Sequence, residues 1–340
     1  MQVLVVCALF AAVAYGRVMV PSWVKPLSDD MINFINNLNT TWKAGKNFHK
    51  DVPMSYLKSL AGALPERESD RLPLHYHEEI SDVLPESFDS REHWFGCHSI
   101  GVIRDQSSCG SCWAFGVVET ISDRICIYTS ARVQVNISAQ DLMTCCFQCS
   151  YQGQGCNGGY PSAAWRFYMT EGIVTGGLYG TADGCQPYSF PPSGYTATGV
   201  VPPPIEPLPP TPPCIRGCRL GYPYTYYQDK HIGWSVYSLP RDEAQIRNEI
   251  FLRGPVQAQF DIYEDFLSYR IGVYQRHSNA YVNGHVVKLI GWGIENGVPY
   301  WLAVNSWNTW WGDYGYFKIR RGTNECNIES WVNTGVPKVT

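Results

Sequence analysis

Charge is scarce in this sequence, and it never accumulates in runs of one sign. Charged residues make up 16% of the 340 residues, and the formal net charge is −4. Binding to nucleic acid phosphates requires a concentrated basic surface, and no run of Lys and Arg occurs in the chain. The composition therefore excludes nucleic acid as the main partner.

Long apolar runs are also missing. The first apolar run covers residues 3–14, and its 12 residues are too few to cross a bilayer. Ala14-Tyr15-Gly16 follows with small residues suited to signal-peptide cleavage. No later run is apolar enough to span a membrane. We predict a signal peptide over residues 1–16, transport through the secretory pathway, and no membrane insertion of the product.

Cysteine is absent from residues 17–83 and then becomes frequent. Most of the 13 cysteines lie between Cys97 and Cys185. Such clustering indicates an oxidising compartment, in which disulfides persist. However, two pairs with C-x-x-C spacing, Cys109 with Cys112 and Cys146 with Cys149, also fit zinc ligands. Spacing alone leaves both interpretations open.

Residues 17–83 form a first unit. Ser28 is a suitable N-cap for a helix whose apolar residues recur at helical spacing from Met31 to Leu38. The unit ends in the charged, loop-like stretch 66–71. Sequence alone is equally consistent with a small N-terminal subdomain and with a removable propeptide.

Two further units are separated by a proline-rich segment. Residues 84–184 include a helical pattern that begins near Ser111, and the unit from about residue 221 contains short strand-like runs and a predicted helix over 240–252. Between them, about 187–213, the frequent prolines predict an extended surface loop. A polyproline ligand is the alternative function for that loop.

The densest chemical signal surrounds Cys112. A thiol attacks a carbonyl as its thiolate, and the free thiol has a pKa of about 8.5. A helix that begins near Ser111 would place Cys112 in its first turn, where unpaired N–H groups and the helix dipole favour the thiolate. A neighbouring imidazolium would lower the pKa further. Taken alone, the C-x-x-C spacing would favour a disulfide or metal site instead.

The segment Cys109-Gly-Ser-Cys112-Trp resembles the active-site cysteine signature of the papain-like cysteine proteases. That family has a histidine and an asparagine about 130–150 residues later. His285 lies 173 residues after Cys112, and Asn305 lies 20 residues beyond His285. The excess over the family's spacing matches an insertion of the size of the proline-rich loop.

The resemblance implies a role for each of these residues. Cys112 would be the nucleophile, and His285 its imidazolium partner and the proton donor to the leaving amine. Asn305 would orient the imidazole ring. The side-chain amide of Gln106 and the N–H of Cys112 would stabilise the oxyanion. The substrate-contacting positions that the resemblance implies are Gly158, Gly159, Pro161, Val286, Trp307 and Trp331, of which Trp307 would also shield the bond between His285 and Asn305.

Within the family the chain resembles the cathepsin B-like branch, notably in Cys156-Asn-Gly-Gly-Tyr-Pro. This resemblance implies an α+β, papain-like two-domain fold, with a helical left domain, a β-barrel-like right domain and the active site in the cleft between them. It also implies that residues 17–83 are a propeptide that inhibits its own protease, and that residues 84–340 are the mature enzyme. An acidic compartment would release the propeptide.

The resemblance also implies a disulfide pattern. The expected pairs are Cys97–Cys126, Cys109–Cys156, Cys145–Cys214, Cys146–Cys149 and Cys185–Cys218. This pattern leaves Cys112 and Cys326 free and removes the ligands of the zinc alternative.

Three parts of the chain depart from the pattern: the occluding loop, the base of the S2 pocket and the turn at Ser107. The occluding loop of the branch carries two histidines that hold a substrate's C-terminal carboxylate, whereas this chain has no histidine between His98 and His231, and Ser193 and Pro204 replace the loop's cysteines. We expect weak or absent removal of C-terminal dipeptides. At the base of the S2 pocket the branch has Glu, and this chain has Trp331.

A buried Trp331 could not form an ion pair with a guanidinium, so we expect an apolar S2 pocket that does not accept Arg. Ser107, where the family usually has Gly, could shift the oxyanion hole slightly.

The resemblance implies polypeptide substrates, cystatin-like protein inhibitors, no cofactor, no metal ion and a monomeric enzyme, either lysosomal or secreted, for example into a digestive lumen. Asn39 and Asn136 lie in N-glycosylation motifs. A catalytically silent binding protein on the same scaffold is the alternative function. The intact set of Cys112, His285 and Asn305, together with Gln106, argues against it.

Overall fold

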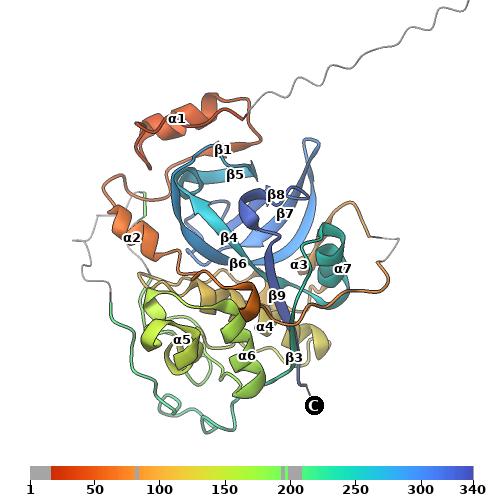
Figure 1. Ribbon diagram of the computed structural model, residues 1–340. Coiled ribbons are helices and arrows are strands. Elements are labelled where there is room, and N and C mark those ends of the chain that lie inside the picture. The colour runs from red at the N-terminus through yellow and green to blue at the C-terminus, as the bar shows by residue number, and fades with distance from the viewer. Residues whose placement is uncertain (1–16, 81–83, 193–195, 198–208, 340) are drawn as a thin grey trace, which may run out of the picture.

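The computed structural model describes residues 17–80, 84–192, 196–197 and 209–339 (Figure 1). The helices are α1 (Asp29–Asn37), α2 (Met54–Ser59), α3 (Ser90–His93), α4 (Cys112–Tyr128), α5 (Ala139–Cys145), α6 (Pro161–Thr170) and α7 (Glu243–Arg253). The strands are β1 (Trp42–Ala44), β2 (Phe88–Asp89), β3 (Gly233–Ser238), β4 (Val256–Tyr263), β5 (Tyr269–Tyr274), β6 (Tyr281–Glu295), β7 (Val298–Val304), β8 (Tyr316–Arg320) and β9 (Trp331–Pro337).

The strands form one curved sheet that stays open. Their order is β1-β5-β8-β7-β6-β4-β9-β3, and β2 pairs with β6 beside this path. β1 and β3 lie at opposite ends of the order and do not pair with each other. The right domain was expected to be β-barrel-like, but its sheet does not close into a barrel. The physical reason is that β1 occupies the free edge of β5, while β3 and β9 turn toward the helices and pack on Tyr168 and Trp165 of α6.

Two hydrophobic cores lie on either side of the boundary between sheet and helices. One core combines the sheet with the first half of the N-terminal unit, and the other surrounds α4 and α6. α4 crosses β6 closely, because a Cβ atom at Gly116 would lie 2.6 Å from the Val286 side chain. This contact brings the first turns of α4 next to the middle of β6.

Local sequence signals explain the helix boundaries. The helix predicted to begin near Ser111 is α4, and 15 of its residues are buried, which explains its apolar face. Ser28 caps α1 as expected, because its hydroxyl accepts the N–H of Met31 at 3.1 Å. Asp242 caps α7, and Gly254, with φ of 103°, ends it where the sequence predicted a stop.

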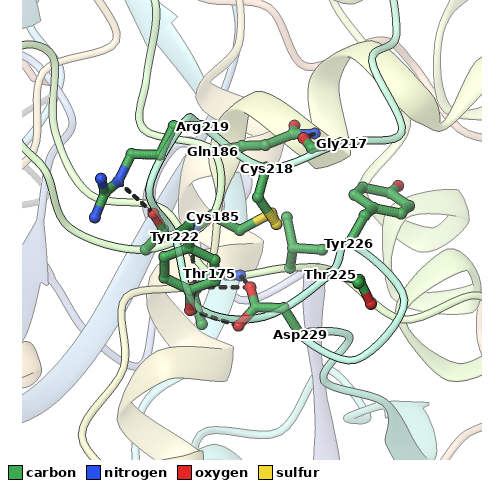
Figure 2. The surroundings of a disulfide bond; sticks show 12 residues. Thr175, Cys185, Gln186, Gly217, Cys218, Arg219, Tyr222, Thr225, Tyr226 and Asp229 are labelled. Carbon is green, nitrogen blue, oxygen red and sulfur yellow. Dashed lines mark hydrogen bonds between the residues drawn. A yellow bond between two sulfur atoms is a disulfide. The ribbon is translucent and has the colours of Figure 1, made fainter.

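The five disulfides have the pairing that the resemblance implied. Cys112 and Cys326 are the free cysteines among the described residues. Figure 2 shows Cys185–Cys218 beside a buried carboxylate, Asp229, which accepts hydrogen bonds from Tyr222 and Thr175. Because Cys109, Cys146 and Cys149 are in disulfides, Cys112 is the one thiol left in the two C-x-x-C pairs, and the zinc interpretation does not apply to them.

The proline-rich segment has neither helix nor strand in its described parts, 187–192, 196–197 and 209–213, although Thr196 forms an isolated β-bridge with Phe48. Ser193 and Pro204, which replace the loop cysteines of the cathepsin B-like branch, lie outside the described residues, as does the predicted signal peptide. Within the described ranges no helix combines the length and apolar character needed to cross a membrane.

Candidate active site

Cys112 is the first residue of α4, and its side chain is fully buried. Its Sγ accepts a hydrogen bond from the backbone N–H of Gly62 at 3.1 Å. No side chain caps the N-terminus of α4, so the helix dipole acts on the sulfur without a competing carboxylate. The thiol therefore has the predicted place in the first turn, with the N-terminal unit lying directly over it.

His285 comes from β6, the strand that α4 crosses. Its Nε2 lies 2.8 Å from Oδ1 of Asn305. Because an amide oxygen only accepts, Nε2 carries the hydrogen and Nδ1 is left as the basic nitrogen. Nδ1 has no hydrogen-bond partner, while the backbone of the next residue, Val286, hydrogen-bonds to the Cys112 thiol.

Trp307 covers this pair as expected. It is 2% exposed, and its ring centroid lies 4.8 Å from that of His285. Removing water from the bond between His285 and Asn305 strengthens it and holds the ring in one orientation.

Gln106 marks a site that receives a carbonyl oxygen. Its Nε2 donates to the carbonyl of Leu60 at 2.9 Å and to that of Cys109 at 2.8 Å. The hydroxyl of Ser306 donates to its Oε1 at 2.7 Å, which fixes the orientation of the amide. The Leu60 carbonyl thus occupies the position in which an oxyanion would be stabilised.

Ser107 has φ of 57°, in the left-handed region that glycine adopts without strain. This conformation explains why the family usually has Gly there. The N–H of Ser107 donates to Oδ1 of Asp105 at 2.7 Å. The turn before Cys109 is therefore kept despite the larger residue.

The electrostatics of the covered site differ from the sequence prediction of a thiolate. Burial raises the pKa of Cys112 to about 11, although backbone hydrogen bonds, among them those of Val286 and Gly62, oppose it. Burial also lowers the pKa of His285 to about 4, against the hydrogen bond of Asn305. Both shifts favour neutral forms, because the N-terminal unit excludes the water that would solvate an ion pair.

The N-terminal unit runs through the cleft as an extended chain. Ala63 donates its N–H to the carbonyl of Gly284 at 3.0 Å. On the other side of the cleft, Gly159 donates to Gly62 and accepts from Leu64, both at 2.9 Å. These bonds hold the chain between the helical side and the sheet.

Glycine is required on the helical wall. Gly158 has φ of 103°, and a Cβ atom there would lie 2.8 Å from the carbonyl oxygen of Gly62. A Cβ atom at Gly159 would lie 2.4 Å from the ring of Trp113. Pro161 is buried at the start of α6, just beyond these glycines, and Val286 is buried against α4.

Glu66 is a contact that sequence reasoning missed. Its carboxylate accepts the backbone N–H of Ser162 at 3.0 Å and the hydroxyl at 3.2 Å, in the first turn of α6. Burial raises the pKa of Glu66 to about 7, although the hydrogen bonds from Ser162 oppose that shift. No local signal marks this glutamate among its charged neighbours.

Trp331 lies on the face of the sheet that lines the cleft. It is opposite Gln259, which is opposite Val286, so the three side chains share one face. The guanidinium of Arg71 lies 4.3 Å above the Trp331 ring and donates to the carbonyl of Ser330 at 2.8 Å. The reasoning that Trp331 is buried and cannot hold a guanidinium is therefore wrong, because the ring is partly exposed and binds the cation through its face.

The arrangement has the parts of a nucleophilic acyl-transfer site. A thiol at a helix N-terminus, a histidine oriented by an amide and a donor for a carbonyl oxygen converge on one cleft. Within the described residues, the cleft contains no cluster of His, Cys, Asp and Glu that could hold a metal ion.

The two glycosylation motifs differ in their surroundings. Asn39 is exposed. The amide of Asn136 already donates to Asp183 at 2.7 Å and accepts from Arg104 at 3.0 Å. Asn39 is thus the more accessible of the two predicted acceptors.

Comparison with known proteins identifies both parts of the chain. Residues 84–336 match the papain family cysteine proteases, and residues 27–67 match the propeptide of peptidase family C1. A cathepsin B-like cysteine proteinase of Caenorhabditis elegans is 42% identical over 98% of this chain and 96% of its own length. One from Schistosoma japonicum is 44% identical over 93% of this chain and 92% of its own length.

A solved structure agrees with these relatives. The structure of a procathepsin B from Trypanosoma congolense is similar with a TM-score of 0.79 and 37% sequence identity, and the match covers 93% of this chain and all of that one. With the thiol, histidine and asparagine assembled under an N-terminal segment, the chain belongs to the papain family of cysteine proteases, as a cathepsin B-like member that carries its propeptide.

Proposed function

We propose that this zymogen matures into an endopeptidase that hydrolyses peptide bonds through the Cys112 thiolate. One contact supports the proposal above the others. The carbonyl of Leu60 accepts from Gln106 at 2.9 Å, and Gly62, two residues later, donates to the Cys112 sulfur at 3.1 Å. A peptide backbone can therefore lie with a carbonyl at the amide donor and its next residues at the thiol.

The reaction follows from these positions. The sulfur of Cys112 bonds to the scissile carbonyl carbon, and the oxygen takes the negative charge beside the Gln106 amide. The oxyanion collapses, the carbon–nitrogen bond breaks, and His285 gives its proton to the leaving amine. Water then attacks the thioester, His285 takes a proton from it, and the acid leaves as the Cys112 thiolate re-forms.

The propeptide silences this chemistry in two ways. It fills the cleft with its own backbone, and it buries Cys112 and His285 so that their neutral forms are favoured. Removal of the propeptide admits water and lets the helix N-terminus and the imidazolium stabilise the thiolate. Removal of the propeptide would therefore open the cleft and ionise the pair of Cys112 and His285 in the same step.

Endopeptidase activity is the finer part of the proposal. In the cathepsin B-like branch, two histidines of the occluding loop hold the C-terminal carboxylate for dipeptide removal, and residues 99–230 of this chain contain no histidine. Without such a clamp, an extended peptide would be cut at internal bonds rather than shortened by dipeptides from its C-terminus. We further propose a monomer of the secretory pathway, lysosomal or secreted, that cystatin-like inhibitors can block.

Two measurements with acid-activated protein test the proposal. Cleavage of a blocked Phe-Arg substrate should be lost in the Cys112→Ala variant. Mass spectrometry of that variant checks that its propeptide has been removed. Peptides with a free C-terminal carboxylate should be cut no faster than their amides. No cleavage by the unaltered protein would favour a silent binding scaffold, and a clear preference for the free acid would contradict the endopeptidase assignment.

A further inference from the structure

Beyond the cleft, the propeptide continues across β3 and α7 on the mature domain. The N–H of His75 donates to the carbonyl of Ser238 at 2.9 Å. The N–H of His77 donates to Oε1 of Gln245 at 2.7 Å, and Gln245 returns a bond to the carbonyl of His77 at 3.1 Å. Residues 72–79, here called the tail segment, are therefore docked by backbone bonds, and two histidine side chains point to the same surface.

The acceptor at the centre of this surface is Glu249 of α7. Its side chain is fully buried, and it accepts from Arg124 at 2.8 Å and from the Tyr237 hydroxyl at 2.7 Å. Burial alone would raise the pKa of Glu249, but Arg124, His77 and Tyr237 outweigh it and lower the pKa to about 2. The carboxylate is therefore ionised at every pH that a secretory compartment reaches.

His77 meets this carboxylate directly. Its Nε2 lies 2.8 Å from Oε2 of Glu249. A carboxylate only accepts, so Nε2 carries a hydrogen and donates in this contact.

His75 is placed in the opposite way. Its Nε2 lies 3.0 Å from Nη1 of Arg253. A guanidinium only donates, so Nε2 must be the acceptor and His75 must be neutral in the docked state. Arg253 cannot swing away freely, because it also donates to the Tyr237 hydroxyl at 3.1 Å and pairs with Glu249 at 3.4 Å.

We propose that His75 is the acid-sensitive latch of the tail segment: its protonation turns the acceptor into a donor facing Arg253, and the segment undocks from β3 and α7. The tail segment ends five residues before Leu84, the first residue of the predicted mature enzyme. The inference rests on the proposed zymogen function and adds the group that senses acid.

The charges around His75 act in one net direction. Burial lowers the pKa of His75, Arg253 and His77 lower it further, and Glu249 alone raises it. The ring centroids of Tyr237 and His75 are 4.7 Å apart. Arg124, on the far side of Glu249, forms an ion pair with that carboxylate. Among the described residues, Glu249 is the anion that raises the His75 pKa, and it does not outweigh burial, Arg253 and His77.

The sign of the pH dependence follows from linkage. A free histidine has a pKa of about 6.5, and docking lowers that of His75. The undocked segment therefore binds more protons, so docking is fully stable above about pH 6.5 and weakens as the pH falls from there toward the lowered pKa of the docked state. The change falls between a neutral and an acidic secretory compartment.

Hydrogen exchange in the full-length Cys112→Ala zymogen tests the latch without any catalysis. Exchange of the His75 and His77 amides is measured at pH 7.5, 6.5 and 5.5 and corrected for intrinsic rates. Protection should fall with the pH, by up to about tenfold for each unit by which docking lowers the His75 pKa. His75→Gln keeps an acceptor for Arg253 but cannot titrate, so its protection should not change with pH.

Two matched variants make the result specific. His77→Gln keeps a donor to Glu249 and should retain the pH dependence of the unaltered zymogen. Arg253→Gln keeps an N–H donor for His75 without the positive charge and should weaken the pH dependence, while burial and His77 still lower the His75 pKa. An unchanged pH dependence in His75→Gln would overturn the proposal. Because no readout uses peptide cleavage, failure of the latch is distinguishable from failure of the proposed enzymatic function.

Discussion

The two halves of the propeptide bind the protease by different physical means. Residues 17–60 join the core of the sheet through buried apolar residues such as Met31, Trp42 and Phe48. Residues 66–79 lie on the surface of the mature domain, held by backbone bonds of the tail segment and by the side chains of Glu66 and His75, which can titrate. The stability that comes from apolar burial does not depend on pH. The stability of the contacts made by the second half does depend on pH.

The difference suggests that the first half anchors the propeptide at every pH and that the second half controls its release. Within the second half the two titratable contacts oppose each other, since acid weakens the contact of His75 and strengthens that of Glu66. Acid should therefore loosen the tail near Leu84 while the segment in the cleft stays bound. If the tail undocks before the segment in the cleft, the active site stays covered until the chain is cut.

The largest effect is expected from breaking the anchor. Trp42 is 1% exposed, stacks on Tyr269 and donates from Nε1 to the carbonyl of Gln275 at 2.9 Å. Trp42→Ala should destabilise docking of residues 29–44 by about 3–5 kcal/mol, equally at pH 7.5 and 5.5. Hydrogen exchange of β1 in the Cys112→Ala zymogen measures this. Trp23→Ala, at a side chain 75% exposed, is the control and should change little.

Glu66 tests the opposing titration. Its pKa is raised to about 7 when it is bound at Ser162, so its contact is most stable below the free value of about 4.3 and weakens as the pH rises through 7. Glu66→Gln should remove this dependence and strengthen docking at pH 8 by on the order of 2 kcal/mol. Exchange of the Leu64 amide between pH 5 and 8 measures the change. A steeper loss of protection in the variant would contradict the assignment.

Trp331 tests whether the cleft wall that holds Arg71 also accepts a substrate guanidinium. A cation over an aromatic face at a partly exposed site is worth about 0.5–1 kcal/mol, less than a buried carboxylate pair. We expect the activated enzyme to cut a Phe-Arg substrate about tenfold better than an Arg-Arg substrate, a difference of about 1.4 kcal/mol. Trp331→Glu should narrow or invert that ratio of kcat/KM, and equal cleavage by the unaltered enzyme would be contrary to expectation.

The smallest effect is expected from Arg71 itself. Its guanidinium stacks on Trp331 and pairs with the exposed Glu68 at 3.1 Å. Arg71→Ala should loosen residues 67–72 by about 1 kcal/mol or less without altering β1. Arg67→Ala, which removes an exposed contact to Asp70 only, is the matched control. A loss as large as that of Trp42→Ala would erase the contrast between the two halves.

Much of the fold was predictable because its signals are local. Ser28, Asp242 and Gly254 mark helix ends, and the pattern after Ser111 marks α4. That the sheet stays open was not predictable in this way. It depends on β1, which comes from the propeptide and pairs with β5 more than 200 residues away.

The catalytic candidates were named from sequence because each lies in a distinctive local motif. The motif around Cys112, the spacing to His285 and Asn305, and the position of Gln106 were sufficient, and the structure brings all four to one cleft. Their protonation was not predictable. It depends on burial by the propeptide, which no motif records.

The sequence by itself determined the family, the disulfide pairing through the family resemblance, and the candidates for the reacting group. Only the tertiary structure decided how the propeptide is held, because those contacts join residues that are far apart in the chain. Glu66 meets Ser162 across 96 positions, and His77 meets Glu249 across 172. An ordinary charged residue becomes a sensor only when folding buries it beside a particular partner, and that proximity is a property of the assembled molecule.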